Sequence, residues 1–302
     1  MVTRRLLMAA AASVAAVPLQ AFANQDPFES EAVRRGRATV PVLLNGEGPF
    51  HFMVDTAANA SLISSDLVER LQLPSVGMIG MHTLVGREIV PAVLASRMNS
   101  GALDARDVRL AVGRRAAISG LDGLLGCDLL ADRQVILNFR GTQRVSIVRS
   151  NAAPRSFHRG VTPGIPVVIA GEKRFGNLLM TPSRVGRSPA VAVIDSGAEG
   201  TILNRAAAIA GRAVPMELDD GQAIRRVQSP TGEVTWGQAM MLPSLSLDGL
   251  VMSNLAVAVG DFHSFRIWGL EDQPAVLIGL DVLRRFKAVH IDLRRSELSL
   301  HM

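Results

Sequence analysis

Short hydrophobic runs recur along the chain, and Gly, Pro, Asn and Asp residues separate them. Alternating or continuous hydrophobic runs between such turn residues are typical of β-strands. Capping residues mark two short helices, one after Asn204 and one within residues 64–73. Because the runs do not alternate with long helices, the pattern predicts an all-β protein. The runs include PVLLNG at 41–46, VRLAV at 108–112, PVVIAG at 166–171 and AVHIDL at 288–293.

The chain also repeats itself. HFMVDTAANASLIS at 51–64 is similar to VAVIDSGAEGTILN at 191–204, and GLLGCDLL at 123–130 returns as VLIGLDVL at 276–283. The paired segments occur in the same order, which indicates two homologous halves. The second half carries extra residues between these landmarks, partly in the segment 260–274.

The amino terminus has the features of an export signal. Arg4 and Arg5 precede a hydrophobic stretch that begins at Leu6, and a small-x-small site follows at residues 21–23. We therefore expect a periplasmic or secreted protein, and the two arginines resemble a loose twin-arginine signal. An uncleaved segment that anchors the chain in a membrane is the alternative, because the hydrophobic stretch is close to spanning length.

The polar stretch 150–162, with Pro154 and Gly160, predicts the boundary between the two halves. The predicted organisation is a signal peptide at 1–23, a linker or short pro-segment at 24–38, an N-terminal lobe at 39–150, a linker at 151–162 and a C-terminal lobe at 163–302.

Composition excludes several classes of function. Hydrophobic residues at 48% and charged residues at 20% are usual for a folded globular chain. The net charge of +5 is scattered in short arginine pairs, and the chain has no tyrosine, so we expect no nucleic-acid partner. Cys127 is the only cysteine, which excludes an internal disulfide. The six histidines show no metal-binding spacing, so we expect neither a metal nor another cofactor.

Asp55 and Asp195 occupy the same position in the two halves. A single Asp-Ser-Gly reads most simply as a turn whose carboxylate accepts neighbouring N–H groups. Homologous halves tend to associate about an approximate two-fold axis, which can bring equivalent turns together. Two carboxyl groups in contact share one proton, so one can act as a general base on water while the other donates a proton.

Asp-Thr/Ser-Gly, followed later by a hydrophobic pair, Gly, Asp and further hydrophobic residues, resembles the signature of the retropepsin-like aspartic peptidases. The resemblance implies two tandem retropepsin-like β-barrel lobes in a pepsin-like bilobal arrangement. It also implies an aspartic endopeptidase that acts on peptide or unfolded protein substrates without a cofactor. A monomer suffices, because one chain carries both aspartates. The matching segments are 55–58 with 124–130, and 195–198 with 277–283.

The resemblance also implies roles for particular residues. Asp55 and Asp195 would be the catalytic pair, and Thr56 and Ser196 would hydrogen-bond across the lobe interface to hold the two loops together. Each lobe would contribute a hairpin flap, at 81–90 and 225–236. The predicted substrate-binding tips of the flaps are Val85, Gly86, Thr231 and Gly232.

Ala57 departs from the family pattern, since it stands where the second half has Gly197. Its methyl group would cost energy at a positive φ and would protrude toward a bound substrate. A catalytically impaired pseudo-protease of the cell envelope that only binds peptides is therefore the alternative. Serine or cysteine chemistry finds little support, because the chain contains no Gly-x-Ser-x-Gly and Cys127 lies in a hydrophobic run.

Overall fold

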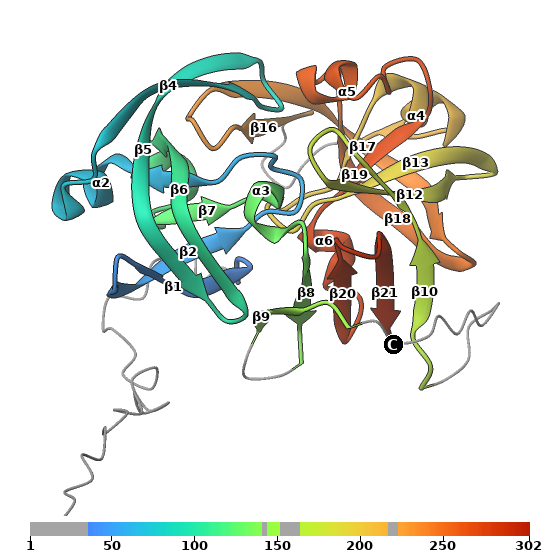
Figure 1. Ribbon diagram of the computed structural model, residues 1–302. Coiled ribbons are helices and arrows are strands. Elements are labelled where there is room, and N and C mark those ends of the chain that lie inside the picture. The colour runs from blue at the N-terminus through green and yellow to red at the C-terminus, as the bar shows by residue number, and fades with distance from the viewer. Residues whose placement is uncertain (1–35, 141–143, 152–163, 217–222) are drawn as a thin grey trace, which may run out of the picture.

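The computed structural model describes residues 36–140, 144–151, 164–216 and 223–302. The predicted signal peptide, most of the predicted pro-segment and nearly all of the predicted 151–162 linker lie outside these residues. Strands dominate and form barrel-like sheets in two lobes, which confirms the all-β prediction (Figure 1). In this part of the chain, none of the helices has the length and hydrophobicity needed to cross a membrane.

The N-terminal lobe is a seven-stranded sheet in the order β1-β2-β7-β3-β6-β5-β4. A further pairing of β1 with β5, at Leu43 and Asn99, curls the sheet toward a barrel. The strands are β1 (Thr39–Leu44), β2 (Glu47–Val54), β3 (Leu62–Ser64), β4 (Ser75–His82), β5 (Arg87–Ser100), β6 (Leu103–Gly113) and β7 (Gly123–Leu125). The helices are α2 (Ser65–Leu71), the 3-10 helix η2 (Arg115–Ile118) and α3 (Cys127–Leu130).

The C-terminal lobe repeats this topology in a nine-stranded sheet, in the order β11-β12-β13-β19-β14-β18-β17-β15 with β16 paired to β17. The strands are β11 (Glu172–Arg174), β12 (Leu178–Val185), β13 (Ser188–Ile194), β14 (Ile202–Leu203), β15 (Val214–Pro215), β16 (Ile224–Gln228), β17 (Val234–Leu247), β18 (Leu250–Val259) and β19 (Ala275–Ile278). The helices are α4 (Arg205–Ala210), α5 (His263–Ile267) and α6 (Leu280–Leu283).

The same parallel pairs occur in both lobes, so the sequence repeat is a structural repeat. β2 pairs in parallel with β7 as β13 pairs with β19, and β3 pairs in parallel with β6 as β14 pairs with β18. Each lobe therefore places the end of its Asp-bearing strand, β2 or β13, beside the strand that carries the later Gly motif.

A third sheet joins the lobes, in the order β10-β21-β20-β8-β9. β8 (Arg133–Asn138) and β9 (Val145–Arg149) come from the first half, and β10 (Val167–Ala170), β20 (Ala288–Asp292) and β21 (Glu297–His301) from the second. β8 and β20 pair antiparallel, from Asn138 opposite Ala288 to Gln134 opposite Asp292. This shared sheet, at the bottom of Figure 1, fixes the lobes to each other, and the sequence did not predict it.

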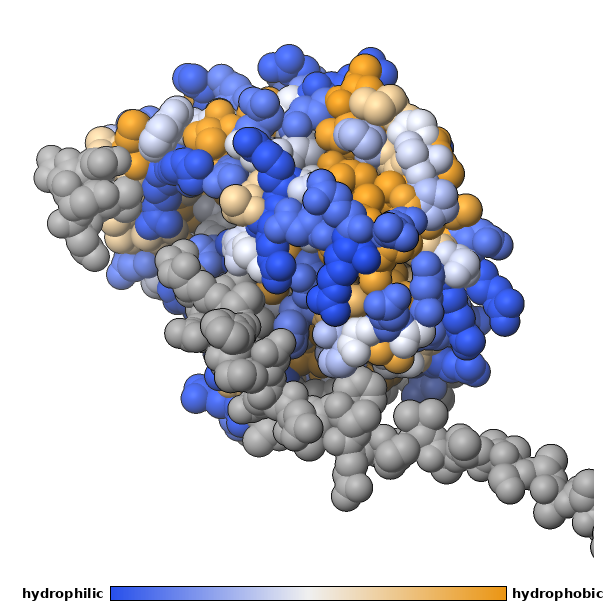
Figure 2. All heavy atoms as spheres, turned by 90° about the vertical axis from the view of Figure 1, so that its left-hand side faces the viewer, coloured by the Kyte–Doolittle hydropathy of each residue, from blue (hydrophilic) through white to orange (hydrophobic). Residues whose placement is uncertain are grey.

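Local sequence explains the elements that hold the two Asp-bearing turns. In β1 the alternation of TVPVLL buries Val40, Val42 and Leu44 on one face. Both predicted helices are present: Ser64 caps α2, and the Asn204 side chain accepts the Ala207 N–H at the start of α4. Figure 2 shows the face on the N-terminal-lobe side, where hydrophilic side chains cover much of the surface and hydrophobic ones gather in patches.

Candidate active site

Two equivalent turns carry the Asp of the repeated motif. Asp55 follows β2, and its Oδ1 accepts the backbone N–H groups of Ala57 and Ala58 at 3.0 and 2.9 Å. Asp195 follows β13, and its Oδ1 accepts the N–H groups of residues 197 and 198 at 2.7 and 3.0 Å. Each turn therefore fixes one carboxylate oxygen and leaves the other free for a partner.

The later Gly of each half lies directly behind its turn. A Cβ on Gly126 would lie 2.8 Å from the Ala58 carbonyl oxygen, and one on Gly279 would lie 2.7 Å from the Gly200 carbonyl oxygen. Glycine is needed because the backbones approach this closely. Asp128 accepts the Ser61 hydroxyl at 2.7 Å. Asp281 accepts the Thr201 hydroxyl at the same distance in the other lobe, so these acids brace the turns.

Thr56 and Ser196 connect the two turns. The Thr56 N–H donates to Ser196 Oγ at 3.2 Å, and the Ser196 N–H donates to Thr56 Oγ1 at 3.1 Å. Each hydroxyl then donates to the opposite lobe, Thr56 Oγ1 to the Ile194 carbonyl and Ser196 Oγ to the Val54 carbonyl, both at 2.7 Å. Both side chains are fully buried, so four hydrogen bonds in a water-free setting hold the turns together.

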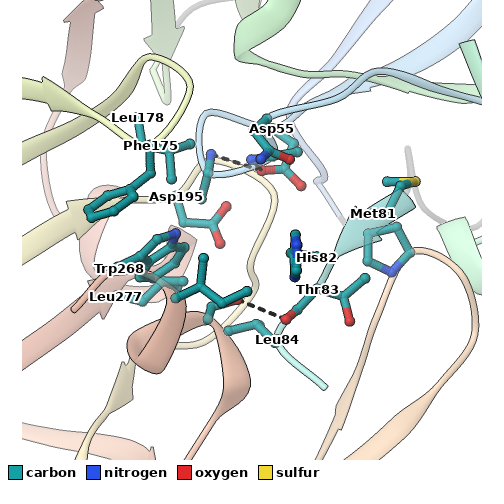
Figure 3. A pocket seen from close by; sticks show the side chains of 16 residues that line it. Asp55, Met81, His82, Thr83, Leu84, Phe175, Leu178, Asp195, Trp268 and Leu277 are labelled. Atoms are coloured by element: carbon teal, nitrogen blue, oxygen red, sulfur yellow. Dashed lines mark hydrogen bonds between the residues drawn. The ribbon is translucent and has the colours of Figure 1, made fainter. Parts of the chain in front are cut away.

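This clasp places the carboxyl groups of Asp55 and Asp195 side by side (Figure 3), close enough for each to shift the pKa of the other. Both residues are buried, at 8% and 5% exposed. Burial raises the pKa of both carboxyl groups. The backbone N–H groups of each turn lower the pKa of its own carboxyl group, and the negative charge of Asp55 raises the pKa of Asp195 further. The two groups therefore titrate as a pair that shares one proton.

Arg37 adds to the difference between the two carboxyl groups. Its Nη1 donates to the Gly197 carbonyl at 2.7 Å, and its Nε lies 3.3 Å from the Glu199 carboxylate. The positive charge of Arg37 also lowers the pKa of Asp55. Sequence reasoning placed this residue in a linker or pro-segment, but it packs between the lobes. The sequence could not predict this contact, because it joins residues 37 and 197, which come together only when the two lobes pack.

Ala57 and Gly197 stand at equivalent positions. A Cβ on Gly197 would lie 2.4 Å from Asp55 Cγ, so glycine is needed there. Ala57 does not have a positive φ, so its methyl group causes no backbone strain of the kind considered from the sequence. The side chain is partly buried and lines the cavity above the acids, where a substrate would meet it.

A cavity of about 90 Å³ lies between the acids and the first flap. In Figure 3, Phe175, Leu178 and Trp268 form one wall, and His82 and Thr83 face them from the other side. Sequence reasoning missed Phe175, Leu178 and Trp268, because they belong to the β11–β12 hairpin and to the end of α5 rather than to the repeated motif. His82 and Thr83 lie within the predicted flap 81–90. The full lining is Asp55, Ala57, Ala58, Asn59, Met81, His82, Thr83, Leu84, Phe175, Leu178, Asp195, Pro230, Ser264, Ile267, Trp268 and Leu277.

Both predicted flaps are hairpins, formed by β4 with β5 and by β16 with β17. The four predicted tip residues do not line the cavity, whereas residues 81–84 and Pro230 do. Val85 and Gly86 instead close the turn by donating their N–H groups to Thr83 Oγ1. In the second flap, Thr231 donates to Glu88 of the first flap, and a Cβ on Gly232 would lie 2.6 Å from Arg114 of the N-terminal lobe. The tips therefore pack against other parts of the protein and do not line the cavity.

Cys127 is buried, and burial raises the pKa of its thiol, which does not suit a nucleophile. Within the described ranges, His, Cys, Asp and Glu side chains form no group of three that could hold a metal ion.

Comparison with known proteins gives one match in each lobe. Residues 40–132 match the family described as gag-polyprotein putative aspartyl protease, and residues 181–282 match the family described as aspartyl protease. No curated protein matches the chain. Among solved structures, the chain is similar to a retropepsin-like aspartic protease from Rickettsia conorii, with 21% identity, coverage of 45% of this chain and 88% of that chain, and a TM-score of 0.29. The chain therefore carries an aspartyl protease domain in each half.

Proposed function

We propose that this protein is an aspartic endopeptidase that cleaves peptide bonds with a water molecule activated between Asp55 and Asp195. The observation that carries the proposal is the side-by-side placement of the two buried carboxyl groups, held by the Thr56–Ser196 clasp. Like charges in contact cannot both ionise, so the pair keeps one proton and offers one base and one acid.

The asymmetry of the pair assigns the two roles. The neighbouring N–H groups and Arg37 hold down the pKa of Asp55. Asp55 therefore accepts a proton from water while the oxygen of that water molecule attacks the peptide carbonyl carbon. Asp195 donates its proton to the carbonyl oxygen, which gives a neutral tetrahedral diol. As the C–N bond breaks, the proton on Asp55 passes to the leaving nitrogen, and a diol hydroxyl returns a proton to Asp195. The cycle restores the starting protonation.

The cleft suits an extended peptide. The flaps β4–β5 and β16–β17 cover the acids, and an added strand can hydrogen-bond to such hairpin edges. Hydrophobic side chains line the cavity beside the acids, among them Leu84, Ile267 and Trp268. We infer that the substrates are peptides or unfolded proteins with apolar side chains near the cleaved bond. The predicted export signal would place this reaction in the periplasm or outside the cell. A monomer would suffice for it, because one chain carries both acids.

A peptide-binding pseudo-protease is the second candidate, and Ala57 favours it. Its methyl group lines the cavity where the other lobe has Gly197. A substrate that must come close to both turns would be held slightly farther from Asp55. Binding would then survive while hydrolysis slowed.

Casein hydrolysis by the purified mature chain tests the proposal. We expect wild type to cleave casein, and Asp55→Asn and Asp195→Asn each to lower the rate by at least about 1,000-fold, because each variant removes one half of the acid–base pair. Asp66→Asn, an exposed position in α2, is the matched control and should cleave normally.

Casein turnover separates the two candidates, and binding of a statine peptide controls for an intact cleft. An enzyme binds the statine peptide and turns over casein, whereas a pseudo-protease binds it without turnover. Casein cleavage by Asp195→Asn at the wild-type rate would overturn the assignment of the acid pair.

A further inference from the structure

The cleft above the acids is narrow and partly covered. Its volume of about 90 Å³ has room for a few water molecules, whereas pockets that hold drug-sized ligands occupy roughly 300–1,000 Å³. A peptide strand can reach Asp55 and Asp195 only if a covering element moves. The N-terminal-lobe flap, residues 81–90, is the cover that contributes four residues to the lining.

This flap is bound to the opposite lobe through its backbone. The Ser264 hydroxyl donates to the Thr83 carbonyl at 2.9 Å, and the His263 N–H donates to the Leu84 carbonyl at 2.9 Å. Both contacts join the end of β4 to the first turn of α5. The two flap carbonyls thus bond to protein groups of the C-terminal lobe, and these contacts hold the flap in place.

A histidine pair adds a third contact. His82 Nδ1 lies 3.3 Å from His263 Nε2, and the two rings are stacked with centroids 5.5 Å apart. One nitrogen must donate and the other accept, so the pair can hold at most one positive charge and keep the bond. Adding a second proton makes both nitrogens donors and places two like charges in contact.

The segment that holds the flap, around α5, is firmly anchored in the C-terminal lobe. Phe262, Phe265, Trp268 and Leu270 are buried, and the rings of Phe265 and Trp268 pack edge to face at 5.8 Å. This segment falls within 260–274, the stretch in which the second half of the chain is longer than the first. The flap turn at 83–86, by contrast, is held mainly by Thr83 and by these contacts to the other lobe, so the flap is the element that moves.

We propose that residues 262–268 form a latch, in which His263 and Ser264 position the N-terminal flap over the acid pair, and that a second proton on the His82–His263 pair releases the flap. The inference deepens the proposed function, since it names what controls access to the same site. Ser264 and His263 act through the flap and are positioning residues.

The charges around the histidine pair favour release of the flap at acidic pH. Arg87 lies opposite His82 in the β4–β5 register, and Arg266 lies on α5; both are cationic. Burial lowers the pKa of His263, and the nearby His82 and Arg266 lower it further. Asp261, just before α5, is paired with Arg205 at 2.7 Å. Asp55 and Asp195 line the same cavity as His82 and together carry one negative charge. Glu88, next to Arg87, accepts a hydrogen bond from the Thr231 hydroxyl.

Hydrogen exchange of the flap amides tests the latch without relying on activity. With exchange corrected for its intrinsic pH dependence, we expect wild-type residues 81–90 to be protected at pH 7.5 and to exchange faster at pH 5. His82→Phe, which removes the bond, should exchange fast at both pH values. His82→Gln keeps a hydrogen-bonding group that does not ionise, and should stay protected at both. Equal protection of the wild-type flap at the two pH values, or acid opening of His82→Gln that matches wild type, would overturn the proposal.

Ser264→Ala tests the positioning role. Loss of one hydrogen bond should favour the open flap by roughly 2- to 10-fold, so KM for a peptide should fall by up to that factor while kcat changes by less than about twofold. Ser253→Ala, at an exposed position in β18, is the matched control. Unchanged flap exchange in Ser264→Ala, with α5 still protected, contradicts the latch. If the wild-type chain has no peptidase activity, the proposed function fails, but the exchange experiment still decides whether the latch exists.

Discussion

Thr56 and Ser196 hydrogen-bond to each other across the lobe boundary in a reciprocal pair, with each backbone N–H donating to the other hydroxyl. They come from positions that correspond in the two halves of the chain, one residue after Asp55 and one after Asp195. Since both are buried, the clasp sets the spacing of the acids as well as the docking of the lobes.

Thr56→Val should lower the free energy of unfolding by about 1–3 kcal/mol, because it keeps the shape of the side chain but leaves the Ser196 N–H and the Ile194 carbonyl without a buried partner. Urea unfolding at neutral pH measures the change. Thr39→Val, at a half-exposed position in β1, should be nearly neutral. Equal effects of the two substitutions would mean that the clasp contributes nothing specific.

Arg37→Met should shift the acid limb of the activity profile to higher pH. The positive charge of Arg37 lowers the pKa of Asp55, so its removal raises that pKa, and Asp55 becomes protonated and inactive at a higher pH than in wild type. The measurement is kcat/KM for a peptide as a function of pH. Arg284→Met removes the same charge from an exposed residue that contacts Gly36, and should leave the acid limb in place.

Gly197→Ala should reduce kcat at least about tenfold, since its Cβ would lie 2.4 Å from Asp55 Cγ and would displace the carboxyl group. Gly200→Ala, three residues along the same loop, meets only Arg225 Nη1 at 3.7 Å and should behave like wild type. Peptide hydrolysis with a crystal structure of each variant separates displacement of the acid from general unfolding. Full activity of Gly197→Ala would contradict the close approach of the two turns.

Asp195→Asn should reduce the loss of stability that the folded protein shows as the pH rises. The pKa of Asp195 in the folded state is raised well above its ordinary value of 3.8. Its contribution to stability is therefore fully present below pH 3.8 and is lost as the pH rises through the folded-state pKa. His290 acts in the opposite direction, because its pKa is lowered to about 4 and its contribution is lost as the pH falls.

The readout is therefore the difference between Asp195→Asn and wild type in urea unfolding at pH 4 and pH 7. The variant should gain stability relative to wild type at pH 7. A difference that is the same at both pH values would show that Asp195 titrates normally in the folded protein.

The repeated motif predicted the two-lobed fold and the acid pair, because each part of the motif meets a local structural requirement. Asp ends a buried strand, glycine permits the close backbone approach at Gly126 and Gly279, and Asn204 caps a helix. These requirements are written in a few neighbouring residues. The two-lobed β fold and the candidate acid pair could thus be anticipated from the sequence.

Contacts between distant segments could not be anticipated. The pairing of β8 with β20, the position of Arg37 between the lobes and the docking of the first flap on α5 join residues that are more than a hundred positions apart. The predicted flap tips illustrate the limit. Gly86 and Gly232 do lie in hairpin turns, but whether a tip faces the cavity depends on the opposite lobe, which no local pattern records.

Carbon-13 NMR titration of the aspartate carboxyl groups tests the shared proton most directly. Asp55→Asn and Asp195→Asn assign the two resonances. The account predicts that Asp55 and Asp195 titrate as a coupled pair, with one step well above pH 3.8, and that Asp195→Asn alters the titration of Asp55. Two independent titrations near pH 3.8, with that of Asp55 unchanged by the substitution, would contradict it.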